Sequence, residues 1–207
     1  MDILAELFSS ETLIRIMRLF YLNAEEVFDA REICERTKMP ARKVRYEINL
    51  LKKIGFVANG TKEILVFTSK KGRARKKKIK GWTINPQFSF LRPLKALLLN
   101  AAPVPNDQML RRLKSAGTLK LVVLTGFFLN GKEGSQNGKV DVLVVGDNLK
   151  KTKIDSVMRF VESKVGKELN YAILTSKEFQ YRMGMYDKFI RDIFDYPHEK
   201  LIDKFGL

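Results

Sequence analysis

Apolar residues near the start of the chain recur every three or four positions, which is the spacing of one face of an α-helix. The first run follows Ser9 and Ser10. Either serine can cap a helix, because its side chain accepts a hydrogen bond from a backbone N–H of the first turn. The apolar positions of this run are Leu13, Ile16, Met17 and Phe20. The pattern predicts a helix that begins directly after the serines.

Two more helices follow, and each has a recognisable start. Asp29 with Glu32 three residues later is the pattern of a capping box, which predicts a short helix through Thr37. Pro40 then stands at the start of a helix over residues 41–54, where its missing N–H costs nothing. The residues expected on the apolar face of this third helix are Val44, Ile48, Leu51 and Ile54.

After Gly55, which ends the third helix, the pattern changes to extended runs. Residues 64–68 and 78–84 are predicted strands on either side of a loop with Gly72 at its tip. This loop lies in residues 70–80, K-K-G-R-A-R-K-K-K-I-K, which hold eight basic side chains in eleven. Three helices followed by two strands around a basic loop predict a winged helix.

The charge of the chain indicates the kind of partner it binds. Lysine and arginine number 39 against 23 aspartate and glutamate residues, a formal net charge of +16. Basic side chains that neutralise phosphates release condensed counterions, so a polyanion is the natural partner. The excess is spread along the chain, and its densest block is residues 70–80.

Cysteine content and hydropathy bear on the expected location. Cys34 is the only cysteine and cannot form an internal disulfide, which fits a reducing cytoplasm. No apolar run approaches the length that crosses a bilayer, so we expect no membrane partner. Because His198 is the only histidine, a zinc site of cysteine and histidine ligands is not expected.

The polar side chains of the third helix lie off its apolar face. The second and third predicted helices would form a helix-turn-helix. In this motif the second member, here the third helix of the chain, enters the major groove with its N-terminal side chains toward the bases. We therefore expect Arg42, Arg45 and Asn49 to read bases, and Lys43, Lys52 and Lys53 to contact phosphates. The expected DNA-binding residues are Arg42, Lys43, Arg45, Tyr46, Asn49, Lys52, Lys53, Lys70, Lys71, Arg73, Arg75, Lys76, Lys77, Lys78 and Lys80.

Residues 44–57, V-R-Y-E-I-N-L-L-K-K-I-G-F-V, resemble the recognition helix of prokaryotic winged helix-turn-helix transcription regulators. The shared pattern is an apolar residue, apolar residues four and seven positions later, then glycine and an apolar pair. The likeness covers about residues 9–84 and implies a nucleic-acid-binding domain over residues 1–86. A winged helix can also dock a protein, and a basic run can be a solvated face or a nuclear-import signal.

Residues 87–117 are expected to be a helical connector. An apolar helical run over 88–99 follows N-P-Q, and A-A-P-V-P-N breaks it before a second helix over 107–114. From residue 118 the pattern alternates between strand and helix, with strands expected at 119–124, 140–145 and 169–174. Helices are expected at 152–166, 176–181 and 185–194. The whole chain is thus predicted to be α+β, with a small α/β domain and a mixed sheet over residues 118–207.

The run T-G-F-F-L-N-G at residues 125–131 precedes a loop and then K-V-D at residues 139–141. With these residues, the second half of the chain, about residues 100–205, resembles the minimal nucleotidyltransferase fold of the DNA polymerase beta superfamily. The family motif is Gly-Ser, three residues, Gly, a loop and Asp-x-Asp on the next strand. Gly126 and Gly131 match the glycines, and Asp141 matches the second aspartate.

Three departures from this motif predict that the chemistry is lost. Phe127 replaces the serine that binds phosphate, Lys139 replaces the first aspartate, and Asn170 falls where a third carboxylate is expected. Two magnesium ions beside a triphosphate need several carboxylate oxygens. We therefore expect no metal site, no cofactor and no enzymatic activity. Lys139 could still hold a phosphate without metal, or the domain could serve only packing or dimer contact.

Together these features predict a DNA-binding transcription regulator that acts on double-stranded DNA, with an inactive nucleotidyltransferase-like domain for ligand sensing or protein contact. A homodimer is compatible with this prediction. Two alternatives stay open at this stage: an active nucleotidyltransferase that modifies RNA or protein, and an RNA-binding protein that uses the same basic surface.

Overall fold

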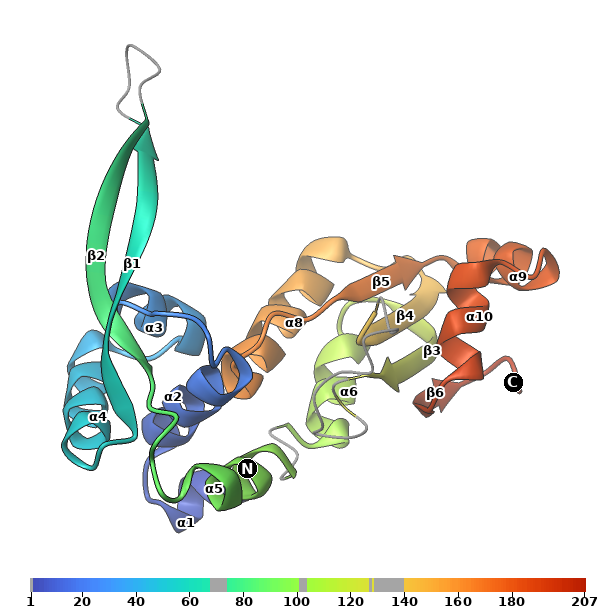
Figure 1. The fold of residues 1–207 in the computed structure, drawn as a ribbon. Helices are drawn as coiled ribbons and strands as arrows, with labels where there is room; N and C mark the ends of the chain where they lie inside the picture. Colours follow the sequence, from blue (N-terminus) through green and yellow to red (C-terminus); the bar gives the residue numbers. More distant parts are fainter. Residues whose placement is uncertain (1, 68–73, 101–103, 127, 129–139) are drawn as a thin grey trace. The chain divides into compact units, whose positions relative to one another are not determined.

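The computed structural model describes residues 2–67, 74–100, 104–126, 128 and 140–207, and its fold is α+β (Figure 1). The chain forms two compact units. The first unit is Ile3–Leu98 with Val165–Lys167, and the second is Leu99–Lys164 and Glu168–Leu207 with Asp2. The division falls inside the segment predicted as a connector, so that its two helices belong to different units. Within the described residues, no helix is long and apolar enough to span a membrane.

The helices of the first unit are α1 (Ile3–Leu7), α2 (Glu11–Leu22), α3 (Ala30–Thr37), α4 (Ala41–Lys53) and α5 (Leu91–Asn100). The starts of α2 and α3 are as predicted. Ser10 caps α2, and its Oγ accepts a hydrogen bond from Leu13 N at 3.1 Å. Asp29 and Glu32 form a complete capping box at α3, with both hydrogen bonds at 2.9 Å. The short helix α1 was not predicted.

The core of the first unit lies between α2, α3 and α4. Val44, Ile48 and Leu51 of α4 are buried in it, as predicted. The prediction for Ile54 was wrong, because its side chain is 51% exposed. The helix ends at Lys53, so Ile54 stands at its C-terminal cap instead of within its buried face, and Gly55 then turns the chain with a φ of +81°.

An antiparallel ribbon follows α4 and is longer than predicted. Its strands are β1 (Val57–Phe67) and β2 (Ala74–Ile84), whereas the sequence predicted shorter strands that begin at residues 64 and 78. The segment after Val57 is poor in β-branched residues, so propensity alone does not identify it. The ribbon extends away from α2, α3 and α4 (Figure 1). The tip glycine, Gly72, lies outside the described residues.

The second unit is built on a four-stranded sheet of order β5-β4-β3-β6. The pair β4 and β5 is parallel, and β3 runs antiparallel to both β4 and β6, so the sheet is mixed as predicted. Its elements are α6 (Asn106–Lys114), β3 (Thr118–Thr125), β4 (Val142–Asp147), α8 (Lys151–Val165), β5 (Tyr171–Leu174), α9 (Ser176–Gly184), α10 (Lys188–Asp195) and β6 (His198–Asp203).

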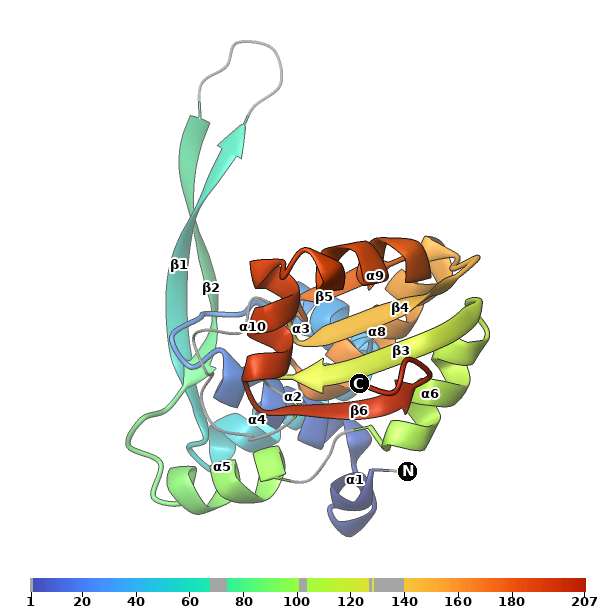
Figure 2. The same ribbon diagram turned by 90° about the vertical axis from the view of Figure 1, so that its right-hand side faces the viewer.

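Helices cover both faces of this sheet, so nearly every residue of its central strands β3 and β4 is buried. On one face, side chains of β3, β4 and β5 pack against Phe179 of α9 and against Ile190 and Ile193 of α10. The other face is covered by α6 and α8 (Figure 2). The apolar side of α8 is buried at the predicted positions, which are Ile154, Val157, Met158, Val161 and Val165.

Some boundaries in the second unit differ from the prediction. The last helix was expected to begin at residue 185 but begins at Lys188, because Asp187 caps it and accepts a hydrogen bond from Phe189 N at 2.8 Å. Helix α9 begins at Ser176 as predicted, is capped by Thr175, and runs to Gly184 rather than ending at residue 181. Strand β6 was not predicted, since H-E-K-L-I-D has no apolar run.

Candidate nucleic-acid interface

The exposed face of α4 gathers the side chains that the sequence assigned to DNA. Residues at intervals of three and four along a helix share a face. Such a line runs through Arg42, Tyr46, Asn49 and Lys53, with Arg45 and Lys52 beside it and Lys43 on the other flank, and all of these side chains are exposed. Tyr46 is 71% exposed. The structure therefore brings these seven residues onto one helix surface.

The opposite face of α4 is held by a polar contact as well as by its apolar side chains. Glu47 is buried, and its Oε1 accepts a hydrogen bond from Ser10 Oγ at 2.5 Å. Arg15 of α2 donates to the carbonyl oxygen of Thr37 at 2.6 Å, just before the turn into α4. These bonds tie both α4 and the preceding turn to α2. Sequence reasoning missed Glu47, because an acidic residue in a basic helix is expected to face solvent.

Helix α3 carries Cys34, the single cysteine of the chain. Burial raises the pKa of the Cys34 thiol, and the nearby guanidinium of Arg45 offsets only part of this effect. The thiol is therefore held in its protonated form near neutral pH, which is the unreactive form.

The base of the ribbon is joined to the segment before α3. Phe28 and Trp82 exchange two backbone hydrogen bonds, each 2.9 Å long, so that Phe28 acts as a short third strand. Gly81 makes this approach feasible, because a Cβ there would lie 2.3 Å from the carbonyl oxygen of Phe28. An ion pair between Lys62 of β1 and Glu32 of α3 lies near this junction. The ribbon is therefore fixed to the helices at its base.

Beyond this base the ribbon carries basic side chains on both faces. Lys78 pairs in register with Glu63, and Lys76 lies one position further along the same face. Both lysines are about three-quarters exposed and share Glu63, at 3.9 Å and 3.7 Å. Lys77 lies on the other face, opposite Ile64, and is exposed.

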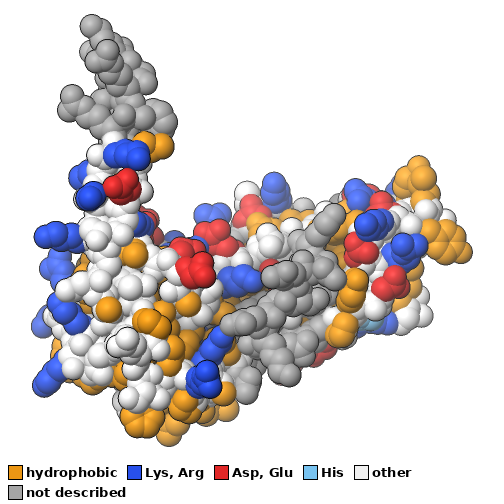
Figure 3. Space-filling model, viewed as in Figure 1, with side chains coloured by type: hydrophobic (Ala, Val, Ile, Leu, Met, Phe, Trp, Pro, Cys, Tyr) orange, Lys and Arg blue, Asp and Glu red, His pale blue; other side chains and the backbone are white. Residues whose placement is uncertain are grey.

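The remaining predicted ribbon residues are only partly described. Lys80 is exposed on the face of Lys76 and Lys78, and Arg75 pairs in register with Val66. Lys70, Lys71 and Arg73 lie outside the described residues. In Figure 3, Lys and Arg side chains mark both α4 and the described part of the ribbon.

The second unit brings together part of the glycine and aspartate motif. Gly126 follows β3 with a φ of +52°, and a Cβ there would lie 3.2 Å from Asp141 Oδ1. Asp141 is buried just before β4, and its Oδ2 accepts a hydrogen bond from Asn170 N at 2.9 Å. Asn170 O in turn accepts from the backbone N–H of Asp141 at 2.6 Å. The Asp141 carboxylate thus joins the starts of the parallel strands β4 and β5.

The other residues of this motif, Phe127, Gly131 and Lys139, lie outside the described residues. Within the described part of the chain, no cluster of three or more His, Cys, Asp or Glu side chains is placed to hold a metal ion.

Comparison of the chain with protein-family models, curated proteins and solved structures finds no match.

Proposed function

We propose that this protein is a DNA-binding transcription regulator whose first unit is a winged helix-turn-helix. The arrangement of α2, α3 and α4 with an antiparallel ribbon held at its base supports this assignment. The observation that carries the proposal is the exposed face of α4, where Arg42, Arg45 and Asn49 stand on a helix whose other face is buried. Arginine and asparagine make the bidentate contacts that distinguish guanine and adenine in the major groove.

The dimensions of α4 and of the ribbon suit a duplex. The thirteen residues of α4 span about 20 Å, and the major groove is about 12 Å wide and admits a helix. The ribbon continues past Lys62 for five residues in β1, about 17 Å, with exposed lysines on both faces. In the proposal, α4 reads base edges while Lys76, Lys77 and Lys78 contact phosphates. Contacts of the second kind add affinity without sequence preference.

The proposal separates the roles of helix and ribbon, and substitutions on α4 test it. Replacing Arg45 or Asn49 with Ala should reduce discrimination at particular base pairs by about 1–3 kcal/mol for each base that the helix no longer reads. Arg111→Ala, at an exposed arginine on α6 of the second unit, is the matched control and should leave sequence preference unchanged. The measurement is selection from random duplex DNA, followed by titration of the selected sites.

Two outcomes of this experiment would contradict the proposal. Failure to select any sequence would show that α4 does not read bases. Tighter binding to duplex RNA than to the selected DNA would favour the RNA-binding alternative.

For the second unit we propose a role in protein contact without nucleotide transfer. Lys139, Phe127 and Asn170 stand where the chemistry of the resembled family needs two carboxylates and a hydroxyl. Asp141 is the remaining motif carboxylate. It accepts a hydrogen bond from Asn170 N and so links the starts of β4 and β5. This bond supports a packing role for Asp141.

Substitution of Asp141 separates the packing role from a catalytic one. Asp141→Ala should lower the free energy of unfolding by about 0.5–1.5 kcal/mol, because the partly buried hydrogen bond from the Asn170 N–H is lost. Asp141→Asn should cost much less, since an amide oxygen can still accept this bond. No protein in the series should transfer nucleotide from a labelled triphosphate with magnesium or manganese. A transfer signal in the wild type that Asp141→Asn abolishes would instead make Asp141 catalytic.

A further inference from the structure

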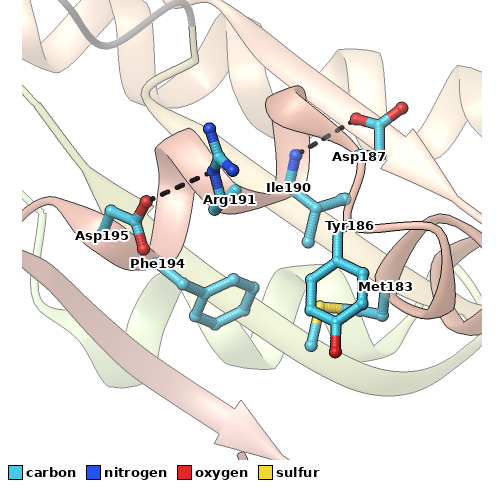
Figure 4. Close-up of a pocket in the computed structure, with 7 residues that line it drawn as sticks. All are labelled: Met183, Tyr186, Asp187, Ile190, Arg191, Phe194 and Asp195. Atoms are coloured by element: carbon cyan, nitrogen blue, oxygen red, sulfur yellow. Dashed lines mark hydrogen bonds and ion pairs between the residues drawn. The ribbon is translucent and has the colours of Figure 1, made fainter.

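A small apolar pocket lies where α9 turns into α10. It has a volume of about 220 Å³ and is lined by Met183, Tyr186, Ile190 and Phe194, with charged side chains at its edge. Figure 4 shows the ring of Tyr186 beside Met183 and the ring of Phe194 nearby. The lining is almost entirely apolar, so the pocket suits a hydrophobic group.

The size of the pocket decides what kind of group fits. Sites for small molecules and cofactors usually measure about 300–1,000 Å³, which is larger than this one. A cavity of about 150 Å³ with aliphatic and aromatic walls accepts benzene. A pocket of 220 Å³ therefore fits one aromatic side chain better than a cofactor.

Exposed aromatic side chains stand at the same corner of the unit. Tyr186, at the edge of the pocket, is 83% exposed, Tyr181 of α9 is 67% exposed, and Met185 of the adjoining turn is 62% exposed. Tyrosine and methionine are enriched in the buried centres of protein interfaces. A projecting ring and a pocket that fits a ring thus occur side by side on one surface.

The charges on α10 are arranged so that they complement themselves. Lys188, Arg191 and Asp195 share one exposed face, with the basic residues in the first half of the helix and the acidic residue at its end. Arg191 and Asp195 already lie 3.6 Å apart within the chain (Figure 4). When two such helices meet antiparallel, Arg191 of each lies opposite Asp195 of the other. A two-fold axis produces this arrangement.

We propose that two copies of this chain pair through the corner of α9 and α10, with Tyr186 of each copy packed into the pocket of the other. The charges of α10 then pair across the axis. This inference does not rest on DNA binding, because the residues that carry it all belong to the second unit. A result that contradicts dimerisation would therefore leave the proposal of DNA binding intact, and the reverse also holds.

Sedimentation equilibrium of the full chain without DNA tests the proposal. The wild type should show a monomer–dimer equilibrium, and Tyr186→Asn should raise the dimer dissociation constant at least about 30-fold, as for one hot-spot aromatic. Asparagine keeps the left-handed backbone that Tyr186 adopts, with a φ of +53°, so the change removes the ring without straining the turn. Tyr46→Asn, at a similarly exposed tyrosine on α4, is the matched control and should leave the dissociation constant unchanged.

A charge-reversal series tests the two-fold arrangement itself. Arg191→Glu should weaken the dimer, because it places like charges across the axis, and addition of Asp195→Arg should restore it. A wild type that stays monomeric at every accessible concentration would overturn the proposal. So would a dimer dissociation constant that Tyr186→Asn leaves unchanged. A double variant, Arg191→Glu with Asp195→Arg, whose dimer is no tighter than that of Arg191→Glu alone would also overturn it.

Discussion

Binding of the full chain to duplex DNA should weaken by a factor of about 10³–10⁴ when salt rises from about 50 to 200 mM. This range assumes that α4 and the ribbon together contact about six to eight phosphates, each of which releases condensed counterions. The exposed lysines on α4 and on both faces of the ribbon, and the net charge of +16, motivate the expectation. The measurement is the dissociation constant of one selected duplex across a salt series. A constant that hardly changes over this range would contradict electrostatic binding.

Removing the charge of the ribbon measures how much of the salt dependence of DNA binding the ribbon contributes. Replacing Arg75, Lys76, Lys77 and Lys78 with Gln should make the slope of log affinity against log salt shallower by about 0.9 for each phosphate that the ribbon no longer neutralises. The loss should be similar for all sequences, because phosphates carry no sequence information. The matched control replaces four exposed lysines of the second unit with Gln: Lys114, Lys150, Lys151 and Lys177. An equal loss of slope in the control would show that the ribbon has no special role.

Gly81→Ala should destabilise the first unit by about 3 kcal/mol, near the upper end of what overpacking costs. The added Cβ would lie 2.3 Å from the carbonyl oxygen of Phe28, and a backbone oxygen cannot move aside as a side chain can. Gly60→Ala should cost less, because its Cβ meets only the Val27 side chain, with the nearest atom at 2.8 Å. Gly184→Ala meets no atom within 4 Å and should change stability by less than about 0.5 kcal/mol.

Chemical denaturation followed by tryptophan fluorescence measures this series. Trp82 is the only tryptophan and lies next to Gly81, so its emission reports on the first unit. If Gly81→Ala were as stable as Gly184→Ala, Phe28 and β2 could not lie as close together as they do in the structure. Loss of DNA affinity in Gly81→Ala, measured under conditions where it stays folded, would further link the fixed base of the ribbon to binding.

Helices α2, α3 and α4 of the first unit could be predicted well because their signals are local. Ser10 and the capping box of Asp29 and Glu32 lie within four residues of the N–H groups that they satisfy. The buried face of α4 follows from the spacing of Val44, Ile48 and Leu51. The ribbon was underestimated because the residues before Ile64 are held by pairing with β2, and β2 is itself held at Trp82 by Phe28, which lies far away in the sequence. No residue near Ala58 or Asn59 carries that information.

The candidate site also contains residues that could be predicted from local spacing and contacts that could not. The exposed residues of α4 could be predicted, because helical spacing separates a polar from an apolar face once the helix is identified. The buried contact of Glu47 with Ser10 could not, since the two are distant in sequence and glutamate is seldom buried. Asp141 was identified from its motif, but only the structure shows the backbone N–H of Asn170 as its partner. Strand β6 pairs with β3, although the two strands lie near opposite ends of the second unit in sequence. The charged sequence of β6 gives no sign that it forms a strand.

The pairing of Phe28 with Trp82 also has a consequence for the order in which the chain folds. Strands β1 and β2 adjoin in sequence, and a hairpin of this kind forms within about 1–10 μs. Phe28 lies before α3 and α4, so its pairing with Trp82 closes a loop that contains both helices. Contacts between distant residues are the slow ones, because loop closure must come before the contact forms. The ribbon would thus exist as a free hairpin first, and Trp82 would reach its native environment only in the final docking step.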